Sequence, residues 1–156
     1  MESNSFQNYR LVALGEHVSL VVAPPSARLQ PDLLHFYLVP IKHAESFVVA
    51  ASETRGVWEE VQRFQSSLNA LYQTVGKGVL LMETVLAHKG FWQTRIEVVP
   101  IPLDQLQDAP IYFQSSMREQ QQELNGTHTQ LYKISSPPKT LSNVLPSKSN
   151  FAYFYV

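Results

Sequence analysis

The chain has 156 residues, of which 44% are apolar and 16% charged, so it can form one folded domain with a buried core. Twelve basic and 13 acidic residues leave a formal net charge of −1, which excludes a polycation that binds nucleic acid by bulk charge alone. The absence of cysteine excludes disulfides, a cysteine nucleophile and thiolate metal sites within this sequence.

Three strands are predicted in the first 40 residues. Two β-rich runs, Tyr9–Leu14 and Val18–Ala23, are joined through Gly15-Glu16, which is typical of a hairpin. Pro24, Pro25 and Pro31 predict an irregular connection after the second strand, because proline has no N–H group to donate to a strand ladder. Leu33–Val39 is the third predicted strand, and we expect Pro40 to end it.

The strongest helical pattern spans Ser52–Val75. Apolar residues recur there at steps of three and four and form one stripe, which Trp58 and Tyr72 widen and which consists of Val57, Val61, Phe64, Leu68, Leu71 and Val75. We expect Ser52 or Thr54 to cap the start of this helix and Gly76 to end it. Its acidic residues are interpreted as a solvated face, and they are Glu53, Glu59 and Glu60.

Two more strands complete the predicted sheet. Gly78–Thr84 is rich in Val and Leu, and Phe91–Val99 is expected to end at Pro100 and Pro102. The order β-β-β-α-β-β predicts an α+β fold, in which one long helix covers an antiparallel five-stranded sheet.

The C-terminal third has a different composition. Ile111–Leu124 predicts a second helix, which Asn125-Gly126 would end, and Ser135–Ser149 is typical of an extended arm rich in Ser, Pro and Lys. The aromatic end, Phe151–Val156, would be unfavourable in water, so we expect it to pair as a strand onto this domain or onto a partner. The chain is therefore divided into a domain of residues 1–104 and a C-terminal part of residues 105–156.

Candidate functional residues lie on the fifth predicted strand. Alternation directs Gln93, Arg95 and Glu97 to one face and Thr94, Ile96 and Val98 toward the helix. Three polar side chains on one face fit either a solvated surface or a binding site. His35 and His43, in and after the third strand, are further candidates, although a lone histidine is more often structural.

Several motifs are absent from the sequence. There is no Gly-rich phosphate loop, no Gly-x-Ser-x-Gly elbow and no His-Glu-x-x-His zinc motif, so we expect no cofactor and no metal. Neither a secretory signal nor an apolar run of membrane-spanning length is visible, so we expect a soluble intracellular protein without a membrane partner.

Several short segments, taken in order, resemble a known family. The run Leu33–His43 looks like the Gly-His-x-Leu-Ile-x-Pro-x-x-His segment of histidine-triad (HIT-like) domains. Three further segments resemble one branch of these domains, the CwfJ family of splicing-associated proteins, and they are Val57–Phe64, Leu80–Thr84 and Ile96–Pro102. Later segments resemble the join to that family's second module and its opening: Ala109–Phe113, Met117–Glu119, Leu145-Pro146 and Tyr153–Val156.

The resemblance also implies which residues stand at the catalytic positions. Active histidine-triad enzymes read His-x-His-x-His-x-x-Pro, and the middle histidine attacks phosphorus. Counted back from Pro100, these positions are Gln93, Arg95 and Glu97 here. Arginine stays protonated and cannot attack, so the resemblance implies a pseudoenzyme. Candidates for phosphate binding are the three triad positions together with His35, Lys42 and His43. Glu97 would either repel an anion or pair with Arg95 or Lys42 and neutralise the site.

The family implies a nuclear, non-catalytic component of a splicing assembly, at the late spliceosome and the excised intron lariat. We expect protein–protein contacts and candidate contacts with intron RNA or snRNA. Lysines of the arm would lie along RNA phosphates or simply keep the arm soluble, and they are Lys133, Lys139 and Lys148. Aromatic residues of the tail would dock on a partner, and they are Phe151, Tyr153, Phe154 and Tyr155.

Other interpretations stay open. A strand edge or the tail could join two copies or a second protein. The chain could be a structural subunit of another complex. It could also be a nucleotide hydrolase or transferase that uses a different nucleophile, for which His35 and His43 are the candidates.

Overall fold

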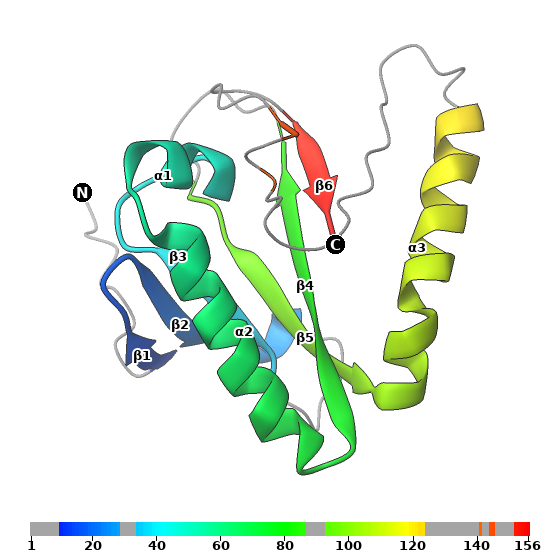
Figure 1. Cartoon of the computed structure of the whole chain (residues 1–156), viewed down its shortest axis with the longest axis horizontal. Coiled ribbons are helices and arrows are strands. Elements are labelled where there is room, and N and C mark those ends of the chain that lie inside the picture. The colour runs from blue at the N-terminus through cyan, green and yellow to red at the C-terminus, as the bar shows by residue number, and fades with distance from the viewer. Residues whose placement is uncertain (1–9, 29–33, 87–92, 124–140, 142–143, 146–151) are drawn as a thin grey trace.

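The structure, a computed structural model, describes residues 10–28, 34–86, 93–123, 141, 144–145 and 152–156. Its strands are β1 (Leu11–Leu14), β2 (Val18–Val22), β3 (Phe36–Pro40), β4 (Lys77–Val85), β5 (Ile96–Pro102) and β6 (Tyr153–Tyr155). Its α-helices are α1 (Phe47–Glu53), α2 (Val57–Gln73) and α3 (Leu103–Glu123). The strands form one sheet in the order β1-β2-β3-β5-β4-β6, and every neighbouring pair is antiparallel (Figure 1).

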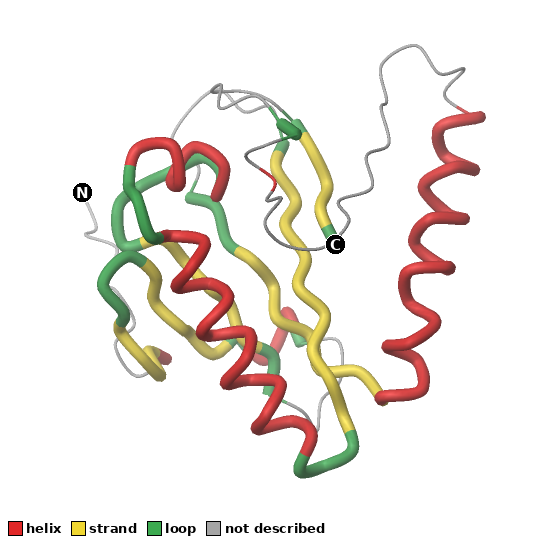
Figure 2. The backbone as a smooth tube through the Cα atoms, viewed as in Figure 1, coloured by secondary structure: helices red, strands yellow, loops and turns green. Residues whose placement is uncertain are grey.

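One face of this sheet packs under α1 and α2 and holds the core (Figure 2). Core side chains from the strands include Val18, Leu20, Phe36, Leu38, Ile96 and Val98, and those from the helices include Phe47, Val61, Leu68 and Tyr72. The predicted α+β class and the antiparallel sheet are confirmed. The sheet has six strands where five were predicted, because the tail pairs with β4 of its own domain.

The single helix predicted for Ser52–Val75 is wrong, because α1 and α2 are separate helices. Ser46 caps α1, and its side-chain oxygen accepts a hydrogen bond from the Val49 N–H at 3.1 Å. The backbone then turns at Gly56, whose φ of +97° is unfavourable for residues with a Cβ. Neither Ser52 nor Thr54 caps the long helix.

The buried stripe of α2 also differs from the predicted one at its C-terminal end. Leu71 and Val75 are 56% and 61% exposed, whereas Tyr72, which was predicted to widen the stripe, is buried. Tyr72 stands four residues after Leu68 and therefore lies on the same face of the helix. Leu71 is rotated by about 100° from Tyr72, so its side chain points away from the core. Gly76, with a φ of +72°, follows the helix as predicted.

The boundaries of β5 and α3 differ from those predicted. β5 begins at Ile96 and continues through Pro100 and Pro102, whereas the predicted strand began at Phe91, of which residues 91–92 lie outside the described residues. Pro100 and Pro102 fit in the strand because, among the described residues, β3 pairs with β5 only as far as Val98. α3 begins at Leu103 instead of Ile111 and contains Pro110. The expected end of this helix at Leu124 and Asn125-Gly126 lies outside the described residues.

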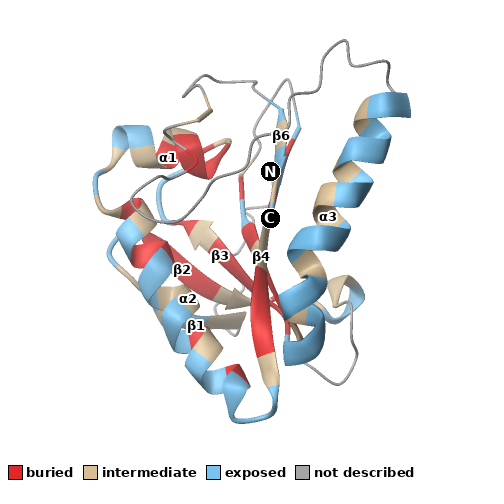
Figure 3. Cartoon of the chain, turned by 45° about the vertical axis from the view of Figure 1, so that its right-hand side comes forward, coloured by how far each residue is buried: buried red, intermediate tan, exposed pale blue. Residues whose placement is uncertain are grey.

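α3 lies on the other side of β4 from α2 (Figure 3). A Cβ at Gly78 would fall 2.4 Å from the Leu106 Cδ2 atom, so the glycine allows the helix to approach the strand. Further along, the Phe113 and Phe154 rings have centroids 6.2 Å apart, which joins α3 to β6. None of the described helices is long and apolar enough to cross a membrane.

Candidate functional site

The candidate site lies where β3 and β5 run side by side, on the sheet face turned away from α2. Tyr37 pairs with Glu97 across these strands, and alternation directs both side chains to this face. The predicted inward set, Thr94, Ile96 and Val98, is fully buried. The predicted alternation of this segment is therefore confirmed.

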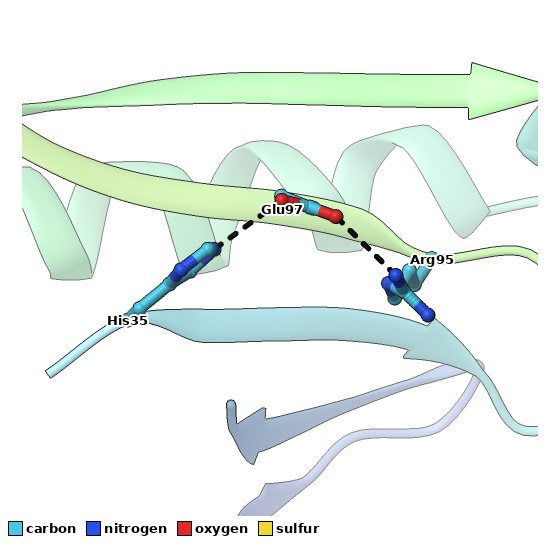
Figure 4. A network of polar contacts seen from close by, with 3 residues as sticks. All are labelled: His35, Arg95 and Glu97. Carbon is cyan, nitrogen blue, oxygen red and sulfur yellow. Dashed lines mark hydrogen bonds and ion pairs between the residues drawn. The ribbon is translucent and has the colours of Figure 1, made fainter. Parts of the chain in front are cut away.

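Arg95 lies directly against β3. Its guanidinium carbon is 4.6 Å from the centroid of the Tyr37 ring, which is a cation–π contact. Its Nη2 atom lies 3.4 Å from the Glu97 Oε1 atom, and the Arg95 side chain is 45% exposed. Arg95 is thus held between the Tyr37 ring and the Glu97 carboxylate, and Figure 4 shows its contact with Glu97.

His35 lies on the other side of Glu97 and is only 2% exposed. Its Nε2 atom is 3.6 Å from the Glu97 Oε2 atom, and its ring meets the Tyr37 ring edge-on. Neither ring nitrogen has a hydrogen-bond partner among the described residues. Burial lowers the pKa of His35, and the Glu97 carboxylate only partly opposes this, so the imidazole is neutral at pH 7.

The structure brings together three of the predicted site residues: His35, Arg95 and Glu97 (Figure 4). With the neutral ring of His35, the opposite charges of Arg95 and Glu97 leave no net charge in this set. We call His35, Tyr37, Arg95 and Glu97 the Arg95 site.

The other predicted residues of this region either lie in the connection between β3 and α1 or form hydrogen bonds with it. The Gln93 side-chain oxygen accepts a hydrogen bond from the Ala44 N–H at 3.3 Å. Its side-chain nitrogen donates to the Pro40 carbonyl at 3.2 Å. Lys42 and His43 are exposed in the same connection. Gln93 therefore stabilises this connection through hydrogen bonds of both its side-chain oxygen and its side-chain nitrogen.

The predicted partner-binding residues of the arm and tail divide into two groups. Lys133, Lys139, Lys148 and Phe151 lie outside the described residues. Tyr153, Phe154 and Tyr155 form β6, on the edge of β4. The tail thus docks on its own domain, one of the two arrangements that its composition left open.

Sequence reasoning missed Glu83, which is completely buried in β4. One carboxylate oxygen accepts hydrogen bonds from the Phe47 N–H at 2.8 Å and the Thr94 hydroxyl at 2.6 Å. The other accepts one from the Tyr153 hydroxyl at 2.6 Å. Burial raises the pKa of Glu83 despite these donors. The available signal was strand alternation: Glu83 stands two residues after Leu81, whose side chain packs against the core, so both side chains point to the inner face of the sheet.

The interpretation of Glu60 as part of a solvated face is wrong. Its side chain is buried, and it accepts hydrogen bonds of 2.7–2.8 Å from the backbone N–H groups of Glu16, His17 and Val18. Glu60 therefore replaces water for three donors at the turn between β1 and β2. The available signal was its spacing, because Glu60 stands three residues after Val57 and four before Phe64, both of which belong to the predicted stripe.

No group of three metal-ligating side chains occurs in the part of the chain that the structure describes.

Comparisons with known proteins place these residues in a family. A sequence model described as "Protein similar to CwfJ C-terminal" matches residues 1–114. Human CWF19-like protein 2 is 28% identical over 122 residues, which cover 78% of this chain and 13% of the relative. Mouse CWF19-like protein 1 is 28% identical over an alignment of 164 residues, which covers all of this chain and 26% of the relative.

A fission yeast relative, the pre-mRNA-splicing factor cwf19 of Schizosaccharomyces pombe, is 26% identical over 119 residues, or 74% of this chain and 18% of the relative. The chain thus spans about a quarter or less of the length of these relatives. The family match covers β1 to β5 with the first part of α3, and it includes every residue of the Arg95 site. The chain belongs to the family of proteins similar to the CwfJ C-terminal region.

Proposed function

We propose that this chain is a CwfJ-like module with a HIT-like fold, which works in a nuclear pre-mRNA splicing assembly and performs no phosphoryl transfer. One observation carries the proposal. Arg95, the residue at the position that active histidine-triad enzymes give to their nucleophile, faces outward beside β3 and pairs with Glu97. A protonated guanidinium cannot attack phosphorus.

The charges of the Arg95 site support a role other than binding phosphate for catalysis. A phosphoryl-transfer site needs donors and positive charge where the anion sits. Here the Arg95 cation already has a carboxylate at 3.4 Å, and the same carboxylate would repel a phosphate. Burial lowers the pKa of His35 and so disfavours the imidazolium, which is the other source of positive charge.

The geometry also weighs against His35 as a replacement nucleophile. Its side chain is 2% exposed, and both ring nitrogens are enclosed. A nucleophile must approach the reacting atom to about 3–3.5 Å, which a buried ring cannot do without rearrangement of its surroundings.

Exposed apolar side chains support a protein as the partner. Val12 and Leu14 on β1 and Ile41 after β3 are each about half exposed or more, and Ile111 and Tyr112 are exposed on α3. Such side chains are what protein interfaces bury. A relative named as a pre-mRNA-splicing factor points to splicing proteins, and the lysines of the arm are the candidates for contacts with intron RNA or snRNA.

Affinity purification of the tagged full chain from its own cells, followed by mass spectrometry, tests this proposal. We expect splicing proteins to be enriched, as the family resemblance to intron-lariat components implies. Arg95→Ala should reduce their recovery, whereas Arg63→Ala, which removes an exposed cation from α2, should not. The absence of splicing proteins, or equal recovery with both variants, would contradict the assigned partner or the assigned surface.

An assay with dinucleoside polyphosphates and nucleotide phosphoramidates tests the non-catalytic part of the same proposal. We expect no turnover above that in buffer. Turnover that disappears in His35→Ala would show that the chain is an enzyme after all.

A further inference from the structure

The geometry around Glu83 points to a binding site beyond the proposed splicing role. We propose that the edge of β4 is a docking site for an extended partner segment that carries a tyrosine, and that β6 is the resident occupant of this site. A partner segment of the same chemistry, a tyrosine directly followed by a second aromatic side chain, would take the place of β6.

Backbone pairing forms the first part of this site. β6 adds to β4 as an antiparallel strand, with Val85 opposite Tyr153, Thr84 opposite Phe154 and Glu83 opposite Tyr155. β5 occupies the other edge of β4 at Glu83. Without β6, the outer edge of β4 would present unpaired N–H and carbonyl groups, which an extended peptide can pair with.

The two faces of β6 meet different surroundings. Tyr153 shares the face of Glu83, where it donates its hydroxyl hydrogen bond. Phe154 points to the opposite face and packs near Phe113 of α3. The site therefore contacts successive side chains on opposite faces of the strand. The buried Glu83 acceptor meets Tyr153 on one face, and the Phe113 ring meets Phe154 on the other.

Glu83 makes the site selective for a hydroxyl group. Phe47 and Thr94, both outside β6, hold one of its oxygens through two hydrogen bonds, so the carboxylate is fixed independently of the tail. Among the described residues, Tyr153 is the donor to the other oxygen. A ligand with phenylalanine in place of this tyrosine would leave a buried carboxylate oxygen without a donor, which costs about tenfold or more in affinity.

The tail competes with any partner because it is part of the same chain. A tethered ligand acts at an effective concentration on the order of millimolar. A free segment will therefore bind measurably only when the tail is weakened. This competition determines the design of the test.

The test uses the full chain with Tyr153→Ala and a fluorescent peptide of residues 150–156, with binding followed by anisotropy. We expect this variant to bind the peptide, and the wild-type chain to exclude it at the same concentration. A peptide with Tyr153→Phe should bind at least about tenfold more weakly. A peptide with Tyr155→Phe is the matched control, because no described residue makes a hydrogen bond to the Tyr155 hydroxyl, and it should bind like the original.

Further variants keep the proposal falsifiable. If Tyr153→Ala fails to fold, the Tyr153→Phe chain serves in its place, since it removes only the hydroxyl group. Glu83→Gln in the tail-weakened chain should reduce the preference for tyrosine. Equal affinity for the tyrosine and phenylalanine peptides, or no binding to either folded tail variant, would overturn the proposal. A complex between wild-type and Tyr153→Ala chains that requires the wild-type tail would support it, with a second copy as the source of the segment.

Discussion

At the scale of single residues, two buried glutamates have opposite pKa shifts. Burial alone would raise the pKa of Glu60, but the N–H groups of Glu16, His17 and Val18 outweigh it and lower the value. For Glu83, burial prevails over its three donors and raises the pKa. Folding therefore favours the charged form of the Glu60 side chain and disfavours the charged form of the Glu83 side chain.

Glu60→Gln should lower the free energy of unfolding at pH 7 by about 2 kcal/mol, because hydrogen bonds to a charged acceptor are lost at a buried turn. The folded-state pKa of Glu60 lies below its ordinary value of 4.5. Its contribution is therefore present above pH 4.5 and is lost as the pH falls through the folded-state pKa. Urea unfolding of both proteins across pH 3–7 checks this.

Exposed Glu59 provides the control for this experiment. Glu59→Gln alters the same charge on the neighbouring position of α2 without touching the β1–β2 turn. It should change the unfolding free energy little at any of these pH values. A Glu60→Gln effect that stayed constant down to pH 3 would contradict the lowered pKa.

At the scale of elements, two glycines with positive φ delimit α2. Gly56 turns the chain between α1 and α2, and a Cβ there would lie 3.1 Å from the His17 imidazole. Gly76 turns the chain between α2 and β4, and a Cβ there would meet no atom within 4 Å among the described surroundings. The two positions have the same backbone requirement but differ in the space around them.

Gly56→Ala should therefore destabilise the protein more than Gly76→Ala. The left-handed backbone costs about 1–2 kcal/mol for an L-residue, and both variants incur this cost. Only Gly56→Ala also forces the His17 ring to shift. Denaturant unfolding of the two variants measures the difference, and equal losses would show that the ring moves without cost.

At the scale of the whole molecule, local patterns predicted the hairpin, the strand order along the chain and the inward face of β5. They also predicted that Arg95 and Glu97 share a face, because alternation is a property of any strand. They did not predict that Ser46 starts a separate helix or that the backbone turns at Gly56, whose neighbour in space, His17, belongs to the distant turn between β1 and β2. They did not predict the roles of Glu60 and Glu83, because the donors of each carboxylate come from segments distant in sequence.

Glu83 connects three parts of the molecule that the chain order keeps apart. Its hydrogen bonds reach the start of α1, the segment before β5, and β6. A buried network of this kind is favourable only when all its members are satisfied. The docked tail is one of those members, so the electrostatics of the core and the position of the tail are coupled.

Glu83→Gln should show a pH dependence opposite in sign to that of Glu60→Gln. The folded-state pKa of Glu83 lies above the ordinary value of 4.5, so the folded protein binds this proton more tightly than the unfolded chain does. The wild-type protein should therefore lose stability relative to Glu83→Gln as the pH rises from about 4.5 through the folded-state pKa. Urea unfolding of both proteins between pH 4 and 8 tests the sign. A difference that stayed flat, or that grew in favour of the wild type with rising pH, would mean that the donors from α1, from the segment before β5 and from β6 outweigh burial.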